Sequence, residues 1–386
     1  MEREARCARI SFGESPTLNR EPMSITRVNI GPIHPSTHGV LRLVVDLEGD
    51  TIENIEPHIG FLHRGVEKLV ETRMYMQCPP YMEKIDYVAP MSVDELYVAA
   101  VEKAMGVEVS EKAQYVRVVL LELQRIASHL FWVGSICNDL GQLFTTFMWG
   151  FRDRDMVLHL LEIATGQRMF YVNMRLGGLS RDLPEGFGEK TLELMDYLEK
   201  RLKEYENLIE KNPIFVDRMK GIGRLSRGDA KEFGVTGHVM RASGLDYDVR
   251  SERPYYVYRK LNFRKQYHLS GDNLARYEVR IMEIKESIRL VREALAGMPE
   301  GSAAGMPIKL ITPNAKNRIV MESRENPRGE EMIYLVADPQ KPYRLSIRSP
   351  TFINLAALNH MARGSRLADL FSIMGTLDLV LADVDR

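Results

Sequence analysis

A heptad pattern of apolar residues between Asn273 and Ala296 limits most strongly what this chain can fold into. Two apolar series, each repeating every seven positions, make up the pattern: Leu274, Ile281, Ile288 and Leu295 in one, and Tyr277, Ile284 and Val291 in the other. A helix with such a stripe buries one face against neighbouring helices. The pattern therefore predicts a long helix facing the core of a helical bundle.

Further helices are predicted between about residues 61 and 211. Their apolar residues recur at helical spacing over Ser92–Met105, Lys112–Gly134, Asp153–Thr165 and Gly188–Lys211. Glycine, proline and tyrosine clusters between about 212 and 270 favour loops and short strands instead. After Pro299 the chain reads as a looser segment with strand-like runs at Met332–Ala337 and Tyr343–Arg348.

A small antiparallel sheet is predicted near the N-terminus. Ile25–Gly31 reads as a strand, and Gly39–Leu47 alternates apolar and polar residues before a turn and a partner at Thr51–Ile55. The fold class is therefore α+β, with this sheet packed on a large helical bundle and short C-terminal strands. We expect residues 1–24 to form a flexible tail and residues 25–386 to form a single domain.

Composition excludes several classes of function. The formal net charge is −1, so no basic field favours nucleic acid. The sequence has neither the run of about 18 apolar residues that a membrane-spanning helix needs nor the apolar core of a signal peptide near Met1. The three cysteines are far apart, which predicts reduced, buried thiols in the cytoplasm rather than disulfides or a zinc site. No nucleotide-binding glycine motif occurs.

Two short motifs resemble the paired cysteine motifs R-x-C-x-x-C and D-P-C-x-x-C, which hold the metals of nickel–iron hydrogenase large subunits. They are Arg73–Cys78 and Asp378–Asp383, and they place Tyr75, Cys78, Val380 and Asp383 at the four ligand positions. One thiolate cannot replace the four that such a soft-ligand site needs. The chain thus resembles a hydrogenase large subunit without its metals, which is how the quinone-site D subunit of respiratory complex I is understood.

The similarity to that D-subunit family extends from about Val28 to Arg386. It is carried by eight motifs in order: Gly31–Gly39, His58–Gly65, Ser128–Leu130, Thr165–Arg168, Arg175–Gly178, Arg241–Gly244, Arg328–Glu330 and Asp383–Arg386. The resemblance implies a hydrogenase-large-subunit-like fold that binds a quinone and holds no metal of its own. It also implies a place beside an iron–sulfur protein, on the cytoplasmic side of the cell membrane, as a peripheral part of a proton-pumping complex.

The resemblance assigns the quinone headgroup to His38 and Tyr87, with Asp139 as the carboxylate that pairs with the histidine. Tyrosine, with a pKa of about 10, donates one hydrogen bond at neutral pH, and histidine, with a pKa of about 6.5, donates as imidazolium. From the residues alone, His38 reads as a turn residue, Tyr87 as packing and Asp139 as a helix cap. The family motifs favour the catalytic roles.

His63 and Arg64 match the family segment near the terminal iron–sulfur cluster of the partner, where a guanidinium raises the cluster potential. The alternative is an ion pair of Arg64 with Glu67 or Glu71. Many relatives carry histidines after Gln-Arg, one of them bound to that cluster, whereas residues 168–173 here contain none. We therefore expect a low cluster potential and a low-potential acceptor, menaquinone or methanophenazine.

The family also implies the partners: the iron–sulfur B subunit, the C and I subunits, the membrane-embedded H subunit and the quinone, without nucleic acid. The electron donor, whether NADH, reduced deazaflavin or ferredoxin, is set by other polypeptides. Two alternatives remain at this point. They are a membrane-bound nickel–iron hydrogenase-like large subunit, which the single motif cysteine Cys78 argues against, and a non-catalytic scaffold.

Overall fold

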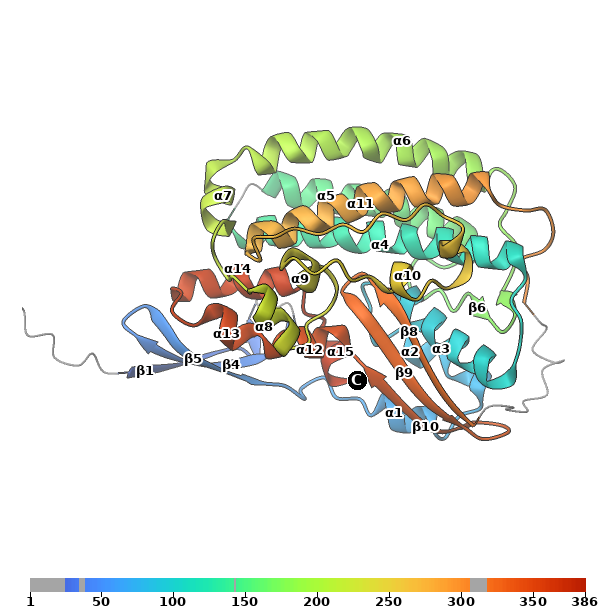
Figure 1. Cartoon of the computed structure of the whole chain (residues 1–386), viewed down its shortest axis with the longest axis horizontal. Helices are drawn as coiled ribbons and strands as arrows, with labels where there is room; N and C mark the ends of the chain where they lie inside the picture. The colour runs from blue at the N-terminus through green and yellow to red at the C-terminus, as the bar shows by residue number, and fades with distance from the viewer. Residues whose placement is uncertain (1–24, 35–38, 142–143, 306–317) are drawn as a thin grey trace, which may run out of the picture.

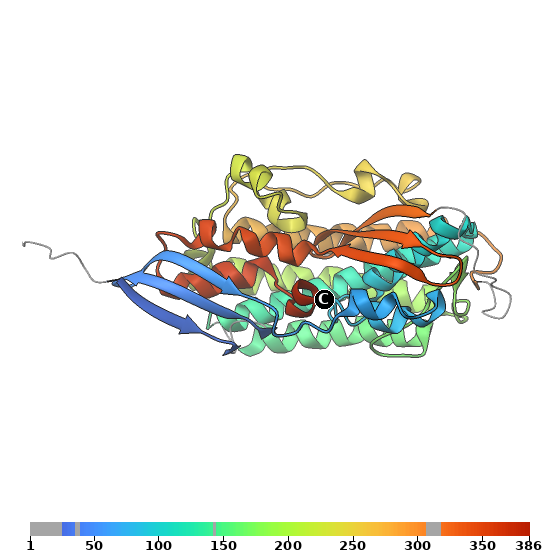
Figure 2. The same ribbon diagram turned by 90° about the horizontal axis from the view of Figure 1, so that it is seen from below.

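The computed structural model describes residues 25–34, 39–141, 144–305 and 318–386, apart from the side chain of Phe144. The expected tail at 1–24 and the site residue His38 lie outside these ranges. The described residues form two three-stranded antiparallel sheets on one side of a bundle of long helices, besides two pairs of two-residue strands (Figures 1 and 2). This confirms the predicted α+β class. Within the described residues, no helix is both long enough and apolar enough to cross a membrane.

The first sheet has the strand order β1-β4-β5 and is antiparallel throughout. Its strands are β1 (Ile25–Ile30), β4 (Arg42–Glu48) and β5 (Thr51–His58), beside the two-residue pair β2 (Ile33–His34) and β3 (Gly39–Val40). The alternation predicted for this region is confirmed, because Leu43, Val45 and Leu47 are buried. They pack with the C-terminal helices that cover this face.

Four long helices lie side by side in the bundle (Figure 1). They are α4 (Glu111–Asp139), α5 (Phe144–Thr165), α6 (Phe187–Tyr205) and α11 (Asn273–Ala296), with α3 (Pro90–Met105) below them. The hydroxyl of Ser110 caps α4, and the carboxyl of Asp272 caps α11. All five predicted helices are confirmed, although α4 continues to Asp139, α5 begins earlier, and α6 passes into a π-helical turn (Glu206–Glu210).

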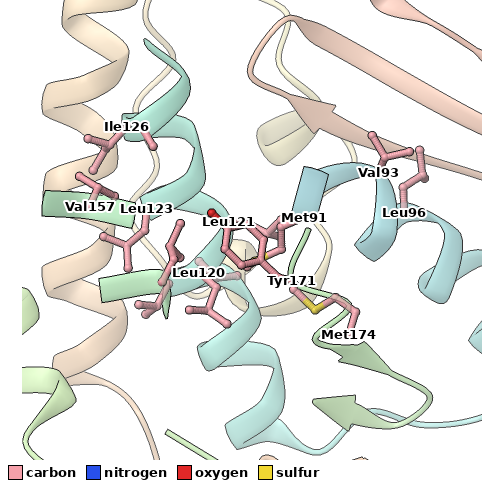
Figure 3. Packing of buried hydrophobic residues seen from close by; sticks show 14 of the residues in the cluster. Met91, Val93, Leu96, Leu120, Leu121, Leu123, Ile126, Val157, Tyr171 and Met174 are labelled. Carbon is pink, nitrogen blue, oxygen red and sulfur yellow. The ribbon is translucent and has the colours of Figure 1, made fainter. Parts of the chain in front are cut away.

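The core lies where α3 and α5 meet α4. Figure 3 shows Leu120, Leu123 and Ile126 of α4 with Val157 of α5, and Met91 of α3 near Tyr171. All of these side chains are buried. Burying such apolar surface is the main favourable contribution to folding.

The interpretation of residues 212–270 as loops and short strands is wrong in part, because the described structure has short helices and no strand there. These helices are α7 (Pro213–Met219), α8 (Arg227–Glu232), α9 (Gly237–Ala242), α10 (Val249–Glu252) and a 3-10 turn, η4 (Tyr256–Arg259). Side chains of Asn212, Ser226 and Asp248 cap three of them. Each is too short to show a helical period in the sequence.

The second sheet has the order β10-β9-β8, with strands β8 (Ile319–Asn326), β9 (Gly329–Ala337) and β10 (Pro342–Arg348). Strands β9 and β10 match the predicted runs, whereas β8 was not predicted because its buried half carries Arg324, Glu325 and Asn326. The expected loose end is instead helical: α12 (Pro350–Ala356), α13 (Leu358–Ala362), α14 (Leu367–Leu377) and α15 (Leu381–Asp385).

The remaining elements are short and connect the sheets to the bundle. They are α1 (Val66–Val70), η2 (Tyr75–Gln77), α2 (Pro79–Met82), β6 (Met174–Arg175) and β7 (Gly178–Leu179). Helices α12 to α15 lie between the two sheets, so the C-terminal segment runs along the middle of this side of the bundle (Figure 2).

Candidate functional site

A cavity of about 240 Å³ opens where three segments distant in sequence meet. Its walls are the turn between α2 and α3, the second half of α4 and the turn between α14 and α15; the lining residues are Tyr87, Val88, Phe131, Ser135, Asp378, Leu379 and Val380. The lining is mostly apolar, with a phenol, a hydroxyl and a carboxylate as its polar groups. Such a cavity suits a flat apolar ring that carries hydrogen-bonding oxygens.

The carboxyl of Asp86 positions Tyr87. Its Oδ1 accepts hydrogen bonds from the backbone N–H groups of Val88 and Ala89, each at 3.1 Å, and so fixes the turn in front of α3. Burial raises the pKa of the Tyr87 phenol, and the neighbouring guanidinium of Arg328 only partly opposes this. Tyr87 is therefore a protonated hydrogen-bond donor at the cavity wall throughout the neutral range.

Asp378 supplies the permanent negative charge of the cavity. It ends α14 in the left-handed backbone region with φ of 54°. Its Oδ2 lies 2.8 Å from Nη2 of Arg280 and 3.4 Å from Nε of Arg328. These two guanidinium groups outweigh the effect of burial and hold the pKa of Asp378 well below its usual range. From the sequence, none of the three was assigned a role, although Asp378 and Arg328 begin the motifs Asp378–Asp383 and Arg328–Glu330.

Asp139 is the last residue of α4 and lies one turn beyond the cavity residue Ser135. Its Oδ2 is 3.7 Å from the place that a Cβ on Gly375 of α14 would take. Asp139 thus lies at the contact of α4 with α14, close to the cavity. Its pairing with His38 stays a prediction, since His38 is outside the described residues; Gly39, which follows it, packs against Leu381.

His63 lines a second cavity of about 380 Å³ in front of α1, and Arg64 is the next residue in the sequence. Nδ1 of His63 lies 2.7 Å from the carbonyl oxygen of Asp385. Arg64 donates to the carbonyl oxygens of Lys84 at 2.8 Å and Ala382 at 2.9 Å. These bonds replace the ion pair with Glu67 or Glu71 that was the alternative. Arg64 therefore ties the second cavity to the two segments that carry Tyr87 and Val380.

The four motif positions that resemble metal ligands lie in two separate places. The Tyr75 hydroxyl donates to the carbonyl oxygen of Asp338 at 2.7 Å. The Cys78 thiol donates to the carbonyl oxygen of Met74 at 3.3 Å. Both are in the main core, where burial raises the pKa of Cys78 to about 11. Val380 and Asp383 lie at the Tyr87 turn instead.

The partner of Val380 and Asp383 is the turn after α2. Val88 packs against Val380, and Asp86 lies beside Asp383. Lys84–Ala89 has the same spacing as the cysteine motif, with Asp86 and Ala89 at the two ligand positions. The sequence carries this spacing, but Arg73–Cys78 matches the cysteine motif better because it contains the arginine and one cysteine. Among the described residues, no group of three or more histidine, cysteine, aspartate or glutamate side chains is placed to hold a metal.

Behind Asp378, a chain of buried charges crosses the bundle. Arg280 also contacts Nδ1 of His129 at 3.1 Å, and Nε2 of His129 lies 2.8 Å from Oε2 of Glu283. Burial and the Arg280 charge lower the pKa of His129 to about 4, which Glu283 only partly opposes. His129 is therefore neutral and structural at neutral pH, and Glu283 in turn binds Arg241.

Comparison with known proteins identifies the class to which the chain belongs. It is a subunit of an oxidoreductase, as its motifs imply. The model of the family "Respiratory-chain NADH dehydrogenase, 49 Kd subunit" matches residues 139–323 and 311–386. The chain is 42% identical over 386 residues to the D subunit of the NADH-quinone oxidoreductase of Geotalea uraniireducens, with 94% of this chain and 99% of the relative covered.

Two further relatives agree. The D subunits of the NADH-quinone oxidoreductases of Geobacter metallireducens and of Dehalococcoides mccartyi (strain BAV1) are 43% and 44% identical. The alignments cover 94% and 93% of this chain, and 99% and 98% of the relatives. The chain therefore belongs to the family of the 49-kDa subunit of the respiratory-chain NADH dehydrogenase.

Proposed function

We propose that this chain is the quinone-site subunit of a membrane-bound, proton-pumping complex I-type oxidoreductase. The observation that carries the proposal is the Tyr87 phenol, which is held protonated at the wall of a largely apolar cavity that Asp378 also lines. The relatives' names state a quinone as their substrate. A donor of this kind suits an oxygen on which negative charge develops during reduction.

The reduction consumes two electrons and two protons for each quinone. The electrons come from the iron–sulfur cluster of a partner subunit, and the chain's own residues supply protons. The Tyr87 O–H bond breaks as an O–H bond forms on the reduced quinone oxygen. His38, paired with Asp139, is the proposed second donor. Asp378, Phe131 and Val380 shape the cavity around the ring.

The proposed surroundings follow from family membership. The iron–sulfur B subunit contacts the chain near His63 and Arg64, and the C, I and membrane-embedded H subunits complete the complex on the cytoplasmic side of the membrane. The donor of electrons, whether NADH, reduced deazaflavin or ferredoxin, is bound by other polypeptides. The acceptor proposed is menaquinone or methanophenazine, because residues 168–173 contain no histidine.

The test is quinone-analogue reductase activity of the assembled complex with Tyr87→Phe. We expect kcat to fall by about a hundredfold or more, since a positioned proton donor contributes that much, while the electron paramagnetic resonance signal of the terminal cluster persists. Tyr81→Phe is the matched control: Tyr81 is a half-buried tyrosine of α2 that does not line the cavity. Activity near that of the unmodified complex in Tyr87→Phe would reduce Tyr87 to a packing residue.

A further inference from the structure

A cluster of buried acidic side chains lies directly behind the turn that carries Tyr87. It consists of Asp86 in that turn, Glu331 on β9 and Asp383 on α15, each only 1% exposed. Nδ2 of Asn326 bridges two of them, at 3.2 Å from Oδ2 of Asp86 and 3.0 Å from Oε2 of Glu331. The three carboxyls come from three distant segments, and none of them lines the quinone cavity.

The positive charge at the cluster does not balance three carboxylates. Arg328 donates to Oδ2 of Asp86 at 2.6 Å, but its Nε also lies 3.4 Å from Asp378. Arg64, which is partly exposed, is the second cation that faces Asp383. Burying an unbalanced carboxylate is costly, and such a group takes up a proton instead. The cluster therefore retains at least one proton at neutral pH.

Two oxygens show where that proton belongs. Oδ1 of Asp383 and Oε1 of Glu331 are buried and have no partner at hydrogen-bond distance among the described residues, although the hydroxyl of Thr351 faces Asp383. The other oxygen of Asp383 accepts from Ser349 Oγ at 2.5 Å, and the other oxygen of Glu331 accepts from Asn326. Burial and repulsion by Asp86 raise the pKa of Asp383 to about 6. Burial and repulsion by Asp383 and Asp86 raise the pKa of Glu331 well above its usual range.

We propose that Asp383 and Glu331 share a proton that reloads the Tyr87 phenol after it has protonated the quinone. The inference rests on the proposed function of Tyr87. A carboxyl O–H bond of the cluster breaks and the phenolic O–H bond forms again, and the cluster takes its next proton from water. The transfer is downhill, because a phenolate is the stronger base. Asp383 and Glu331 act through Tyr87 and do not touch the quinone.

Two substitutions should move the pH profile in opposite directions. Turnover falls on the alkaline side when the shared proton is lost. Glu331→Gln removes the more basic of the two carboxyls, so only Asp383, whose pKa is about 6, is left to hold the proton, and the alkaline limb of kcat moves to lower pH. Ser349→Ala removes the donor that stabilises ionised Asp383, so that pKa rises and the limb moves to higher pH.

The measurement is kcat and KM of the assembled complex with a quinone analogue, as a function of pH. We expect each limb to move by about one pH unit, which is tenfold in kcat on the alkaline side, with KM unchanged. Glu286→Gln is the matched control, since Glu286 is also buried and accepts from the backbone N–H of Arg264 on the far side of the bundle; its profile should not move.

The proposal of a shared proton would be overturned if the kcat–pH profiles of Glu331→Gln and Ser349→Ala stayed unchanged, or if both moved in the same direction. If Glu331→Gln does not assemble, Ser349→Ala decides alone, together with the infrared band of a protonated carboxyl in the unmodified complex. That band should be present at neutral pH and shift in heavy water, and its absence would also overturn the inference. If Tyr87→Phe loses activity but the pH profiles of the other two variants do not move, only the shared proton of Asp383 and Glu331 is contradicted. If Tyr87→Phe keeps full activity, the proposed quinone site itself is contradicted.

Discussion

Arg241 shows how a single side chain holds the interior of this molecule together. Its guanidinium lies 2.6 Å from Glu283, 2.8 Å from Glu325 and 3.3 Å from Asp248, and it is fully buried. These carboxylates raise the pKa of Arg241 against the effect of burial. Removing such a buried group strongly lowers the stability of the fold, because its partners stay behind as unpaired buried charges.

We predict that Arg241→Met destabilises the chain by about 3–5 kcal/mol. Hydrogen–deuterium exchange of α9 and α11 in the assembled complex measures the effect, because the loss of local stability increases exchange there. Arg363→Met is the control, since Arg363 is exposed and lies 3.9 Å from Glu53, an arrangement that contributes less than about 1 kcal/mol. Equal exchange in the two variants would contradict the structural role of Arg241.

At the scale of elements, α4 and α5 pack with their backbones in contact at two glycines. A Cβ on Gly150 would lie 2.7 Å from the carbonyl oxygen of Leu130, and one on Gly134 would lie 3.3 Å from that of Phe147. A backbone oxygen cannot move aside without its helix. This crossing brings Phe131 and Ser135 of α4 to their places in the cavity wall.

We expect Gly150→Ala to destabilise the chain by about 1–3 kcal/mol, because the two helices must separate. Gly188→Ala is a matched change in α6, where nothing lies within 4 Å of the added Cβ. It should stabilise the chain by about 0.4–1 kcal/mol through the lower entropy of the unfolded state. The two variants are compared by the melting temperatures of their complexes. A higher melting temperature in both would show that the α4–α5 contact tolerates a methyl group.

The long helices and the first sheet were predictable from the sequence because each buries one regular face. The stripe from Leu274 to Leu295 and the alternation from Leu43 to Leu47 need no tertiary information. Strand β8 was not predictable, since Arg324 and Glu325 are buried there by ion pairs with distant residues. Among the C-terminal helices, α12, α13 and α15 are too short to show a helical period.

The cavity could be predicted only in part, for a related reason. Asp378 and Val380 stand in one motif, and Arg328 stands in another. The sequence does not show that Arg280 and Arg328 both meet Asp378, because the three lie on segments far apart in sequence. The sequence shows that such charged residues exist. Which of them form ion pairs depends on how distant segments pack in the folded chain. The proposal that residues 25–386 form one domain stays a prediction, as do the roles of His38 and Asp139.

On the scale of the whole molecule, the C-terminal segment joins the two cavities. Asp378 and Val380 line the Tyr87 cavity, whereas Val384 and Asp385 line the one beside His63. The carboxylate of Asp385 accepts from the backbone N–H groups of Gly60 and Leu62, both at 2.7 Å. A shift of this segment would therefore move the walls of both cavities together.

The redox prediction concerns residues 168–173, which we expect to lie near the partner's cluster. Phe170 and Val172 are held there with positive φ, at 58° and 39°, and the backbone N–H of Val172 donates to Glu83. Met169 is exposed. Because no imidazolium stabilises the reduced cluster from this segment, we expect a low potential that suits menaquinone or methanophenazine.

Redox titration of the terminal cluster in the intact complex, followed by electron paramagnetic resonance, tests this expectation, with Met169→His as the informative variant. A histidine there adds a cationic donor, so the potential should rise and should rise further at low pH, where the imidazole is charged. Burial raises the pKa of Glu83 to about 7, so Glu83 adds its own pH dependence and Glu83→Gln serves as the control. A high cluster potential in the unmodified complex, falling as the pH rises even in Glu83→Gln, would contradict the low-potential acceptor.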